Sequence, residues 1–398
     1  MGKTKGPRPA VFLDRDGVLV KEVGYITSRE QVELYPGAAE AVAALNRSGW
    51  LCVVVTNQSA VARGMLTEAE LAGIHCYLKD RLRTEGARLD AVFYCPHFPP
   101  DEGDEDKPPY RVRCPCRKPG TGMVDKALGL FNIDTKRSFI IGDRESDMML
   151  GLNAGLSTVL LRTGYGVNYY KKGKERVEPE FVFDDLAEAV GFLLTAPSEF
   201  AYLEEVVAER YLSSADKKLL VLVGGQSRSG KSTMVRFLVR QMKLRSIPAT
   251  VICLDDWILP LDKRRSSRTV LERYPEAAIK KDIITLLAGD SVVIEAYEAA
   301  SRGLERRPKV VSLPPKGIVF IEGVVALSFE FLRSISETRI FVAVDEQTHR
   351  SRFLQYYRDK GLTGDAIARL YEERMCDEYP FVEESRRYAG IVSHSKKD

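Results

Sequence analysis

The sequence AVFLDRDGVLV at residues 10–20 begins as an apolar run typical of a buried strand and ends in two aspartates followed by a glycine. Asp14 and Asp16 therefore stand at the carboxyl end of the expected strand, and Gly17 allows the chain to turn sharply there. Parallel α/β sheets build their sites at that edge. Similar apolar runs alternate with helical patterns through the first half of the chain, which predicts βαβ units and a parallel sheet.

The same alternation begins again at residues 217–225, KKLLVLVGG, which open a second series of expected strands. A chain of 398 residues is too long for one ordinary core. We therefore expect an α/β protein with two doubly wound, Rossmann-like parallel-sheet domains in tandem, residues 1–196 and 217–398. A helical linker is expected over residues 197–216, after a break at Pro197 in the sequence Ala-Pro-Ser.

The composition excludes several classes of protein. Hydrophobic residues make up 44% of the chain and charged residues 29%, which is too apolar for a disordered chain. Lys and Arg total 59 against 56 for Asp and Glu, so the chain as a whole is not a basic nucleic-acid coat. No apolar run approaches the ~20 residues that cross a bilayer, and no apolar segment of a secretory signal follows MGKTKGPRP. We expect a cytoplasmic protein without a membrane partner.

Three of the seven cysteines, Cys95, Cys114 and Cys116, cluster in the sequence with His97. In a reducing compartment such a cluster indicates a metal site before a disulfide. Three sulfur ligands and one nitrogen ligand make a closed tetrahedral zinc set. We therefore expect a structural zinc ion that fixes the loop following Cys116. Four unrelated polar residues on a long loop are the alternative.

A further acidic run, GDRESD at residues 142–147, follows the apolar run SFII. Together with the aspartates after the first strand, it supplies oxygen ligands suited to Mg²⁺. The metal would neutralise phosphate charge while a carboxylate attacks phosphorus, which is covalent catalysis through an aspartyl-phosphate. A carboxylate pair by itself would more often be a solvated strand end, so the interpretation depends on the complete set.

The order of these motifs resembles the haloacid dehalogenase superfamily of phosphatases: DRDG, a strand ending in Thr56, CRKP around Lys118, and GDRESD. The strings TNQSAVARG, CPH, CPCRKP and GTGM are similar to those of the D-glycero-D-manno-heptose 1,7-bisphosphate 7-phosphatases, over about residues 8–170. Histidinol-phosphate phosphatases are near relatives that share the zinc cluster. The sequence departs from the family pattern at Ala60, where the family usually has glycine.

This resemblance implies a role for each residue. Asp14 would be the nucleophile, and Asp16 the general acid that protonates the leaving alkoxide and then the base that activates water. Mg²⁺ would be held by Asp14, Asp16 and Asp143, with Asp147 supporting the site. The phosphoryl group and the substrate would be held by the others: Thr56, Asn57 and Lys118 at the phosphoryl group, Arg117 at the substrate, and Arg63 at a second phosphate. A surface arginine at a helix cap is the alternative for Arg63.

The second series of strands carries a phosphate-binding pattern, LVLVGGQSRSGKST at residues 220–233. Its glycines let backbone N–H groups turn toward phosphate oxygens, and the following helix presents its positive N-terminus. We expect ATP here, with Lys231 on the β- and γ-phosphates and the Ser232 hydroxyl on Mg²⁺. The expected nucleotide-binding residues of this loop are Gly225, Ser227, Ser229, Gly230, Lys231, Ser232 and Thr233. A regulatory nucleotide-binding domain is the principal non-catalytic alternative.

Acidic residues end two further expected strands, Asp255 after ATVICL and Glu322 after GIVFI. With the basic segment RSRFLQYYRDKG, this half resembles the uridine kinase and phosphoribulokinase group of P-loop kinases over about residues 217–393. The resemblance implies Asp255 as the base that takes the acceptor's proton. It also implies a lid that closes over the transferred phosphoryl group, with three cations, Arg350, Arg352 and Arg358. A solvated helix face is the alternative for the basic segment.

Two arginines distinguish this half from the uridine kinases. Arg273, in ERYPEA, stands where those enzymes carry an acid for the ribose hydroxyls, and Arg302, in YEAASRG, stands near their base-reading histidine. Two cations at these places favour an acceptor that already bears phosphate over uridine. Surface arginines are the alternative.

These patterns predict a bifunctional enzyme for small phosphorylated metabolites, with ATP, Mg²⁺ and a structural Zn²⁺. We expect the second domain to phosphorylate a sugar phosphate, such as a heptose 7-phosphate at its anomeric hydroxyl, and the first domain to remove the older phosphate. The alternatives are a 5′-hydroxyl kinase and 3′-phosphatase for nucleic-acid ends, a nucleoside kinase fused to a phosphatase, and a chain with one inactive domain. Near-neutral charge and only two tryptophans argue against nucleic acid.

Overall fold

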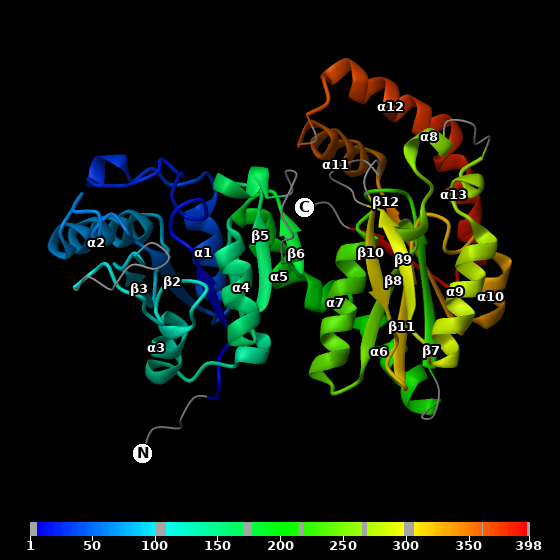
Figure 1. The fold of residues 1–398 in the computed structure, drawn as a ribbon, viewed down its shortest axis with the longest axis horizontal. Helices are drawn as coiled ribbons and strands as arrows, with labels where there is room; N and C mark the ends of the chain where they lie inside the picture. Colours follow the sequence, from blue (N-terminus) through cyan, green and yellow to red (C-terminus); the bar gives the residue numbers. More distant parts are fainter. Residues whose placement is uncertain are drawn as a thin grey trace. The chain divides into compact units, whose positions relative to one another are not determined.

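The structure is a computed structural model that describes residues 6–100, 109–169, 177–214, 218–264, 269–297, 306–359 and 361–395. The chain divides into two compact units, Met1–Thr195 and Ala196–Asp398. Each unit is built on its own parallel sheet with helices around it (Figure 1). The prediction of two parallel-sheet α/β domains is therefore confirmed.

The first unit contains a six-stranded sheet in the order β3-β2-β1-β4-β5-β6, and all its strand pairs are parallel. Its strands are β1 (Ala10–Leu13), β2 (Leu51–Asn57), β3 (Ala91–Cys95), β4 (Phe139–Gly142), β5 (Ser157–Leu161) and β6 (Phe181–Phe183). The order reverses between β1 and β4, which is where doubly wound sheets bind their ligands. The sequence predicted five of these strands, and β6 is too short to show a pattern.

Helices connect these strands. They are η1 (Arg29–Gln31), α1 (Ala38–Arg47), α2 (Glu68–Thr84), α3 (Gly122–Leu130), η2 (Thr135–Arg137), α4 (Glu145–Ala154), η3 (Gly164–Asn168) and α5 (Leu186–Glu199), where η marks a short 3₁₀ helix. Helix α2 begins with a capping box, in which Glu70 N donates to Thr67 Oγ1 and Thr67 N donates to Glu70 Oε2. Every residue of β1 is buried, as expected for a strand covered on both faces.

The second unit contains a five-stranded parallel sheet in the order β13-β12-β7-β11-β8 and a separate antiparallel pair, β10-β9. The strands are β7 (Lys218–Gly225), β8 (Ala249–Cys253), β9 (Val292–Tyr297), β10 (Arg306–Val311), β11 (Gly317–Glu322), β12 (Thr338–Val344) and β13 (Ile391–Ser395). The four strands expected from apolar runs are β7, β8, β11 and β12. The β9–β10 pair was not anticipated, because the sequence of β10, RRPKVV, starts with four residues that are not typical of a strand.

The helices of the second unit are α6 (Ala201–Ser213), α7 (Lys231–Leu244), η4 (Leu254–Trp257), α8 (Leu261–Arg264), η5 (Leu271–Arg273), α9 (Glu276–Ala288), α10 (Glu330–Ile335), α11 (Glu346–Asp359), α12 (Gly364–Asp377), α13 (Tyr379–Glu384) and η6 (Ser385–Tyr388). A separate apolar cluster joins α11 to α12 and α13 through Phe353, Ile367, Tyr371 and Tyr379. None of the helices among the described residues has both the length and the hydropathy to span a bilayer.

Helix α5 is not interrupted at Pro197, contrary to expectation. Helix α5 runs through Pro197 to Glu199, and the interruption falls at Phe200, before α6. A proline removes one N–H donor and crowds the carbonyl four residues earlier, but Pro197 lies in the last turn of α5, where the buried Ala196 beside it packs against the core. Phe200 packs against Phe237 of α7, with ring centroids 5.6 Å apart. The described part of the expected linker, residues 197–214, is thus mostly helical and belongs to the second unit.

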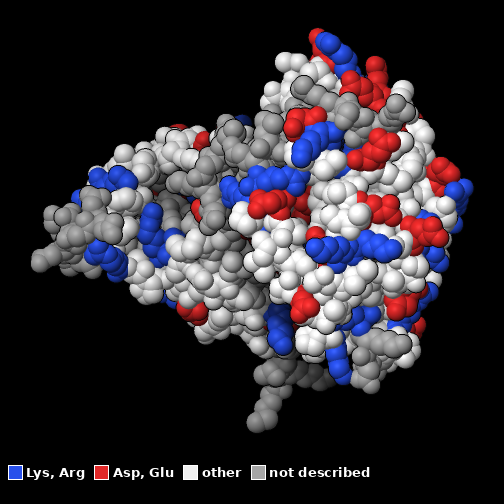
Figure 2. All heavy atoms as spheres, turned by 45° about the vertical axis from the view of Figure 1, so that its right-hand side comes forward, with Lys and Arg blue, Asp and Glu red and all other residues white. Residues whose placement is uncertain are grey.

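Positive and negative side chains are interspersed on the face shown in Figure 2, where Lys and Arg alternate with Asp and Glu among the described residues. This distribution agrees with the near-balance of 59 basic and 56 acidic residues in the chain.

Candidate active sites

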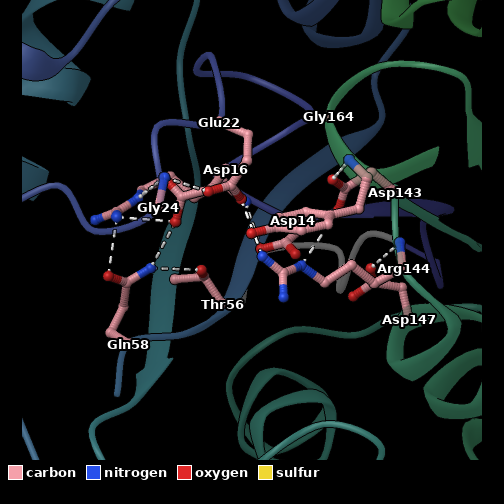
Figure 3. Close-up of polar contacts among 12 residues, drawn as sticks. Asp14, Asp16, Glu22, Gly24, Thr56, Gln58, Asp143, Arg144, Asp147 and Gly164 are labelled. Carbon is pink, nitrogen blue, oxygen red and sulfur yellow. Dashed lines mark hydrogen bonds and ion pairs between the residues drawn. The ribbon is translucent and has the colours of Figure 1, made fainter. Parts of the chain in front are cut away.

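Three carboxylates meet at the carboxyl edge of the first sheet (Figure 3). Asp14 follows β1, Asp143 follows β4, and Asp147 lies in the first turn of α4. One carboxylate oxygen of each residue lies within 4.8 Å of those of the other two, and all three residues are buried. Because β1 and β4 are neighbours in the sheet, the fold brings together two motifs that are far apart in the sequence.

Lys118 lies inside this carboxylate cluster. Its Nζ is 2.7 Å from Asp14 Oδ2 and 2.6 Å from Asp147 Oδ1. Burial by itself would lower the pKa of Lys118, but the two carboxylates outweigh burial and the pKa is raised, so the side chain is charged. Asn57 holds the main chain of Lys118, accepting from its N–H at 3.0 Å and donating to its carbonyl at 3.2 Å. In the structure Asn57 therefore orients Lys118.

The donor set fits a magnesium ion. Burial, together with the charges of Asp14 and Asp147, raises the pKa of Asp143 to about 8. Asp143 Oδ2 accepts from Tyr165 N at 2.8 Å, whereas its buried Oδ1 has no hydrogen-bond partner among the described residues. Gly17 has φ +81°, and a Cβ there would collide with Asp143 Oδ2. Crowded, buried carboxylate oxygens with an unused acceptor are what a hard divalent cation requires.

Asp16 lies outside this cluster. Its carboxylate accepts from Arg15 Nε at 3.0 Å, from Arg15 Nη2 at 2.9 Å and from Gln58 Nε2 at 3.0 Å. Gln58 Nε2 also donates to Thr56 Oγ1 at 2.9 Å. The structure thus joins Asp16 to Thr56 through Gln58. Neither Arg15 nor Gln58 was predicted as a site residue, although Arg15 lies in DRDG and Gln58 in TNQSAVARG.

The expected zinc ligands converge. Cys116 Sγ lies 3.2 Å from Cys95 Sγ, 3.2 Å from Cys114 Sγ and 3.3 Å from His97 Nδ1. All four donor atoms lie within 4.8 Å of one another, and all three cysteines are free of disulfides. Three thiols and an imidazole at these separations suit tetrahedral Zn²⁺.

Arg117 and Arg63 share an aromatic neighbour. Their guanidinium carbons lie 5.3 and 4.2 Å from the ring centroid of Phe98. Arg117 Nη1 also donates to the carbonyl of His97 at 3.0 Å, which ties the arginine to the cysteine cluster. Burial lowers the pKa of Arg117, and the like charges of Arg63 and Arg144 lower it further. Arg63 and Arg117, on one ring, suit an anionic ligand, whereas Arg144 forms an ion pair with Glu22 at 3.0 Å. Arg144, in GDRESD, was not singled out from the sequence.

The glycine-rich loop of the second unit connects β7 to α7. Gly225 and Gly230 have φ of +142° and +94°, and a Cβ on Gly225 would collide with the carbonyl of Val342. Lys231 Nζ donates to the carbonyls of Gly225 at 3.0 Å and Gln226 at 2.6 Å. The lysine is thus held over the concave side of a loop whose shape requires glycine.

Other residues of this loop contact β11 and α11. Ser232 Oγ donates to Glu322 Oε1 at 2.7 Å. Glu322 ends β11, and burial raises its pKa, against the influence of Lys231 and Ser232. The carbonyl of Ser227 accepts from His349 Nε2 of α11 at 2.8 Å. Ser229 Oγ is buried without a hydrogen-bond partner among the described residues. The sequence predicted Glu322 at the end of a strand but indicated no role for it.

Asp255 lies in η4, directly after β8, and its Oδ1 accepts from the hydroxyl of Tyr274 at 2.7 Å. Of the expected lid cations on α11, Arg350 and Arg358 are exposed, Arg352 is partly buried, and the guanidinium of Arg350 lies 5.8 Å from the ring centroid of Tyr371.

Of the two arginines expected at the acceptor, Arg273 lies among the described residues. Arg273 forms ion pairs with Asp377 and with Glu378, the latter at 3.6 Å. Its guanidinium is therefore engaged within the protein. Arg302 lies outside the described residues.

The two halves of the chain match different families of known proteins. A family model described as HAD-hydrolase-like matches residues 115–189, and the phosphoribulokinase / uridine kinase family matches residues 220–397. The D-glycero-D-manno-heptose-1,7-bisphosphate 7-phosphatase of Thermosynechococcus vestitus is 40% identical over 191 residues, which are 48% of this chain and 97% of that protein. The D-glycero-beta-D-manno-heptose-1,7-bisphosphate 7-phosphatase of Rhodopseudomonas palustris is 44% identical over 149 residues, 37% of this chain and 81% of that protein.

Among solved structures, the D,D-heptose 1,7-bisphosphate phosphatase of B. bronchiseptica, complexed with magnesium and phosphate, is 32% identical. The match covers 47% of this chain and 99% of that chain, with a TM-score of 0.42.

Proposed function

The chain belongs in its first half to the HAD-like phosphatases and in its second half to the phosphoribulokinase and uridine kinase family, and from this premise we propose that both halves act on one sugar phosphate. The second unit transfers the γ-phosphoryl group of ATP to the anomeric hydroxyl of a heptose 7-phosphate. The first unit then removes the 7-phosphate and leaves a heptose 1-phosphate. The carboxylate cluster around Lys118, in a half 40% identical to a heptose bisphosphate phosphatase, carries this proposal.

In the proposed hydrolysis, a carboxylate oxygen of Asp14 attacks phosphorus while the bond to the sugar oxygen breaks. Asp16 gives its proton to that leaving oxygen. Asp16 then takes a proton from the water that hydrolyses the phosphoaspartate, which returns Asp14 and inorganic phosphate. Lys118, charged between Asp14 and Asp147, offsets the charge of the phosphoryl group. Mg²⁺, held by Asp14 and Asp143 with Asp147 behind them, would supply further neutralisation of that charge.

In the proposed phosphorylation, the main-chain N–H groups of the glycine-rich loop and Lys231 bind the phosphates of ATP. Ser232 and Glu322 would hold the accompanying Mg²⁺, which offsets phosphate charge. Asp255 takes the proton of the acceptor hydroxyl. The hydroxyl of Tyr274 donates one hydrogen bond to Asp255 Oδ1, and because a carboxylate oxygen has two lone pairs, the carboxylate can still accept that proton.

Two arginines of the second unit, Arg306 and Arg264, support an acceptor that already bears phosphate. Arg306 of β10 donates to the carbonyls of Ile258, which follows η4, and of Glu295. Arg306 is paired in register with Tyr297, and the guanidinium of Arg264 lies 5.4 Å from the ring centroid of that tyrosine. Burial lowers the pKa of Arg306, and the adjacent charge of Arg264 lowers it further. Two like charges brought together suit an anion.

The proposal is tested with the full chain, ATP, Mg²⁺ and D-glycero-D-manno-heptose 7-phosphate, followed by ³¹P NMR. We expect a heptose 1,7-bisphosphate signal that gives way to heptose 1-phosphate and inorganic phosphate. If the chain instead phosphorylates uridine, or a 5′-hydroxyl oligonucleotide, and leaves the heptose 7-phosphate unchanged, the proposal is wrong.

The acceptor arginines give a sharper prediction. We expect Arg306→Met to raise the KM for the phosphorylated acceptor by about 10-fold to 100-fold, because a charge-assisted contact is lost. The KM for ATP should stay unchanged. The matched control is Arg307→Met on the same strand, because side chains of neighbouring strand residues point to opposite faces. Equal effects of the two substitutions on the acceptor KM would contradict this assignment.

The cysteine cluster gives a prediction about zinc. We propose that Cys95, His97, Cys114 and Cys116 hold a structural Zn²⁺, and that Arg117 is tied to it through His97. The wild-type protein should bind one equivalent of zinc, measured by elemental analysis, and Cys116→Ser should bind less. The same substitution should lower phosphatase turnover by about 10-fold to 100-fold. Kinase turnover should not change. Cys76→Ser, an exposed cysteine of α2, is the control. A Cys116→Ser variant that retains a full equivalent of zinc would refute the site.

A further inference from the structure

Arg15 stands between the two aspartates of the DRDG motif, and its side chain is almost wholly buried, with 1% exposed. It donates to both carboxylate oxygens of Asp16, from Nε at 3.0 Å and from Nη2 at 2.9 Å. Nη2 also donates to Gln58 Oε1 at 2.8 Å, and Nη1 lies 3.3 Å from His75 Nε2. A guanidinium that meets a carboxylate in this two-pronged geometry restricts its orientation more than a single contact does.

His75 braces Arg15 from helix α2. Burial, with the nearby charges of Arg15 and Lys79, lowers the pKa of His75 to about 3, so its imidazole is neutral. Because a guanidinium group can only donate, Nε2 of His75 accepts and Nδ1 carries the proton. The ring of Tyr94 packs against His75 with centroids 5.5 Å apart. The imidazole is therefore fixed in place behind Arg15.

Gln58 fixes the other side of Asp16. Its Oε1 accepts from Arg15, and its Nε2 donates to Asp16 Oδ2 at 3.0 Å and to Thr56 Oγ1 at 2.9 Å. Asp16 Oδ2 consequently accepts two hydrogen bonds, whereas Oδ1 accepts one. A carboxylate oxygen has two lone pairs, so Oδ1 is the oxygen that keeps one open.

We propose that His75, Arg15 and Gln58 are positioning residues that hold Asp16 with Oδ1 as the atom that passes the proton. In the first step the proton moves from Oδ1 to the leaving alkoxide oxygen as its bond to phosphorus breaks. In the second step Oδ1 takes one proton from the attacking water. This inference rests on the proposed role of Asp16 as general acid and base, and it extends that role to a histidine on a neighbouring helix.

The test compares two phosphate esters that differ in how much the leaving group needs a proton. The phenolate released from p-nitrophenyl phosphate leaves without protonation, whereas the alkoxide of 2-glycerophosphate requires it. We expect His75→Leu to slow the first turnover of 2-glycerophosphate, measured by rapid quench, by about 10-fold to 100-fold. The first turnover of p-nitrophenyl phosphate should change by less than about 3-fold, because acid catalysis contributes little to it. The KM for either ester should be unchanged.

Two further variants separate positioning from folding. His75→Gln places an acceptor oxygen near Arg15 Nη1 and should restore most of the 2-glycerophosphate rate. Leu78→Ala, at another buried position on α2, should lower the thermal midpoint without any dependence on the leaving group. If the wild-type protein hydrolyses both esters, equal slowing of their hydrolysis by His75→Leu would overturn the inference. Failure of His75→Gln to restore the 2-glycerophosphate rate would overturn it as well. A wild-type protein that hydrolyses neither ester would instead contradict the proposed phosphatase itself.

Discussion

Asp14→Asn is expected to reduce phosphatase turnover by about 10⁴-fold or more, because a carboxamide of the same size cannot attack phosphorus. The substitution also removes one of the two ion pairs of Lys118, at 2.7 Å from Asp14, and leaves the other with Asp147 intact. Release of inorganic phosphate from heptose 1,7-bisphosphate measures the loss. Kinase turnover should stay within about 2-fold, since the two sites share no residues.

The fold should survive this substitution. Asp14 adds negative charge to two buried carboxylates, and it contributes to the raised pKa values of Asp143 and Asp147. Removing its charge relieves repulsion, so we expect an unchanged or higher thermal midpoint. The matched control is Asp125→Asn, an exposed acid of α3, which should retain full phosphatase activity. An Asp14→Asn variant that keeps a substantial fraction of wild-type turnover would exclude Asp14 as the nucleophile.

The second large effect is expected for Lys231→Met, which should lower kinase turnover by at least about 10²-fold to 10³-fold. The side chain is buried, and burial lowers the pKa of Lys231 against the opposing influence of Glu322 and Asp255. Its hydrogen bonds to the carbonyls of Gly225 and Gln226 hold it over the loop. A buried cation in this place stabilises the charge of the transferred phosphoryl group more than an exposed one could.

Transfer of phosphate from ATP to heptose 7-phosphate measures this effect, with phosphatase activity as the internal reference. Phosphatase turnover should again stay within about 2-fold of wild type. The control is Lys243→Met, an exposed lysine in the last turn of the same helix. If Lys231→Met and Lys243→Met gave the same kinase turnover, the loop would not be the catalytic ATP site, and the interpretation of this unit as a regulatory nucleotide-binding domain would gain support.

Much of the architecture could be predicted from the sequence. The strands that carry Asp14, Asp143 and Glu322 are continuous apolar runs, because parallel strands are buried on both faces. Glycine-rich and acidic motifs at their ends marked both sites, since parallel strands gather their carboxyl ends at one edge. The strands that the sequence did not predict were β6, β9, β10 and β13. Strand β6 has three residues, and β10 begins with Arg-Arg-Pro-Lys.

The amino-acid sequence by itself determined nine of the strands and the chemical groups at their carboxyl ends, because hydrophobic periodicity and glycine spacing act over short distances along the chain. Only the tertiary structure decided the partners of those groups. It turned Asp16 toward Arg15 and Gln58, placed His75 of α2 behind Arg15, and engaged Arg273 with Asp377. Such contacts depend on how helices pack against the sheet, and a buried charge is stable only where packing supplies its partner.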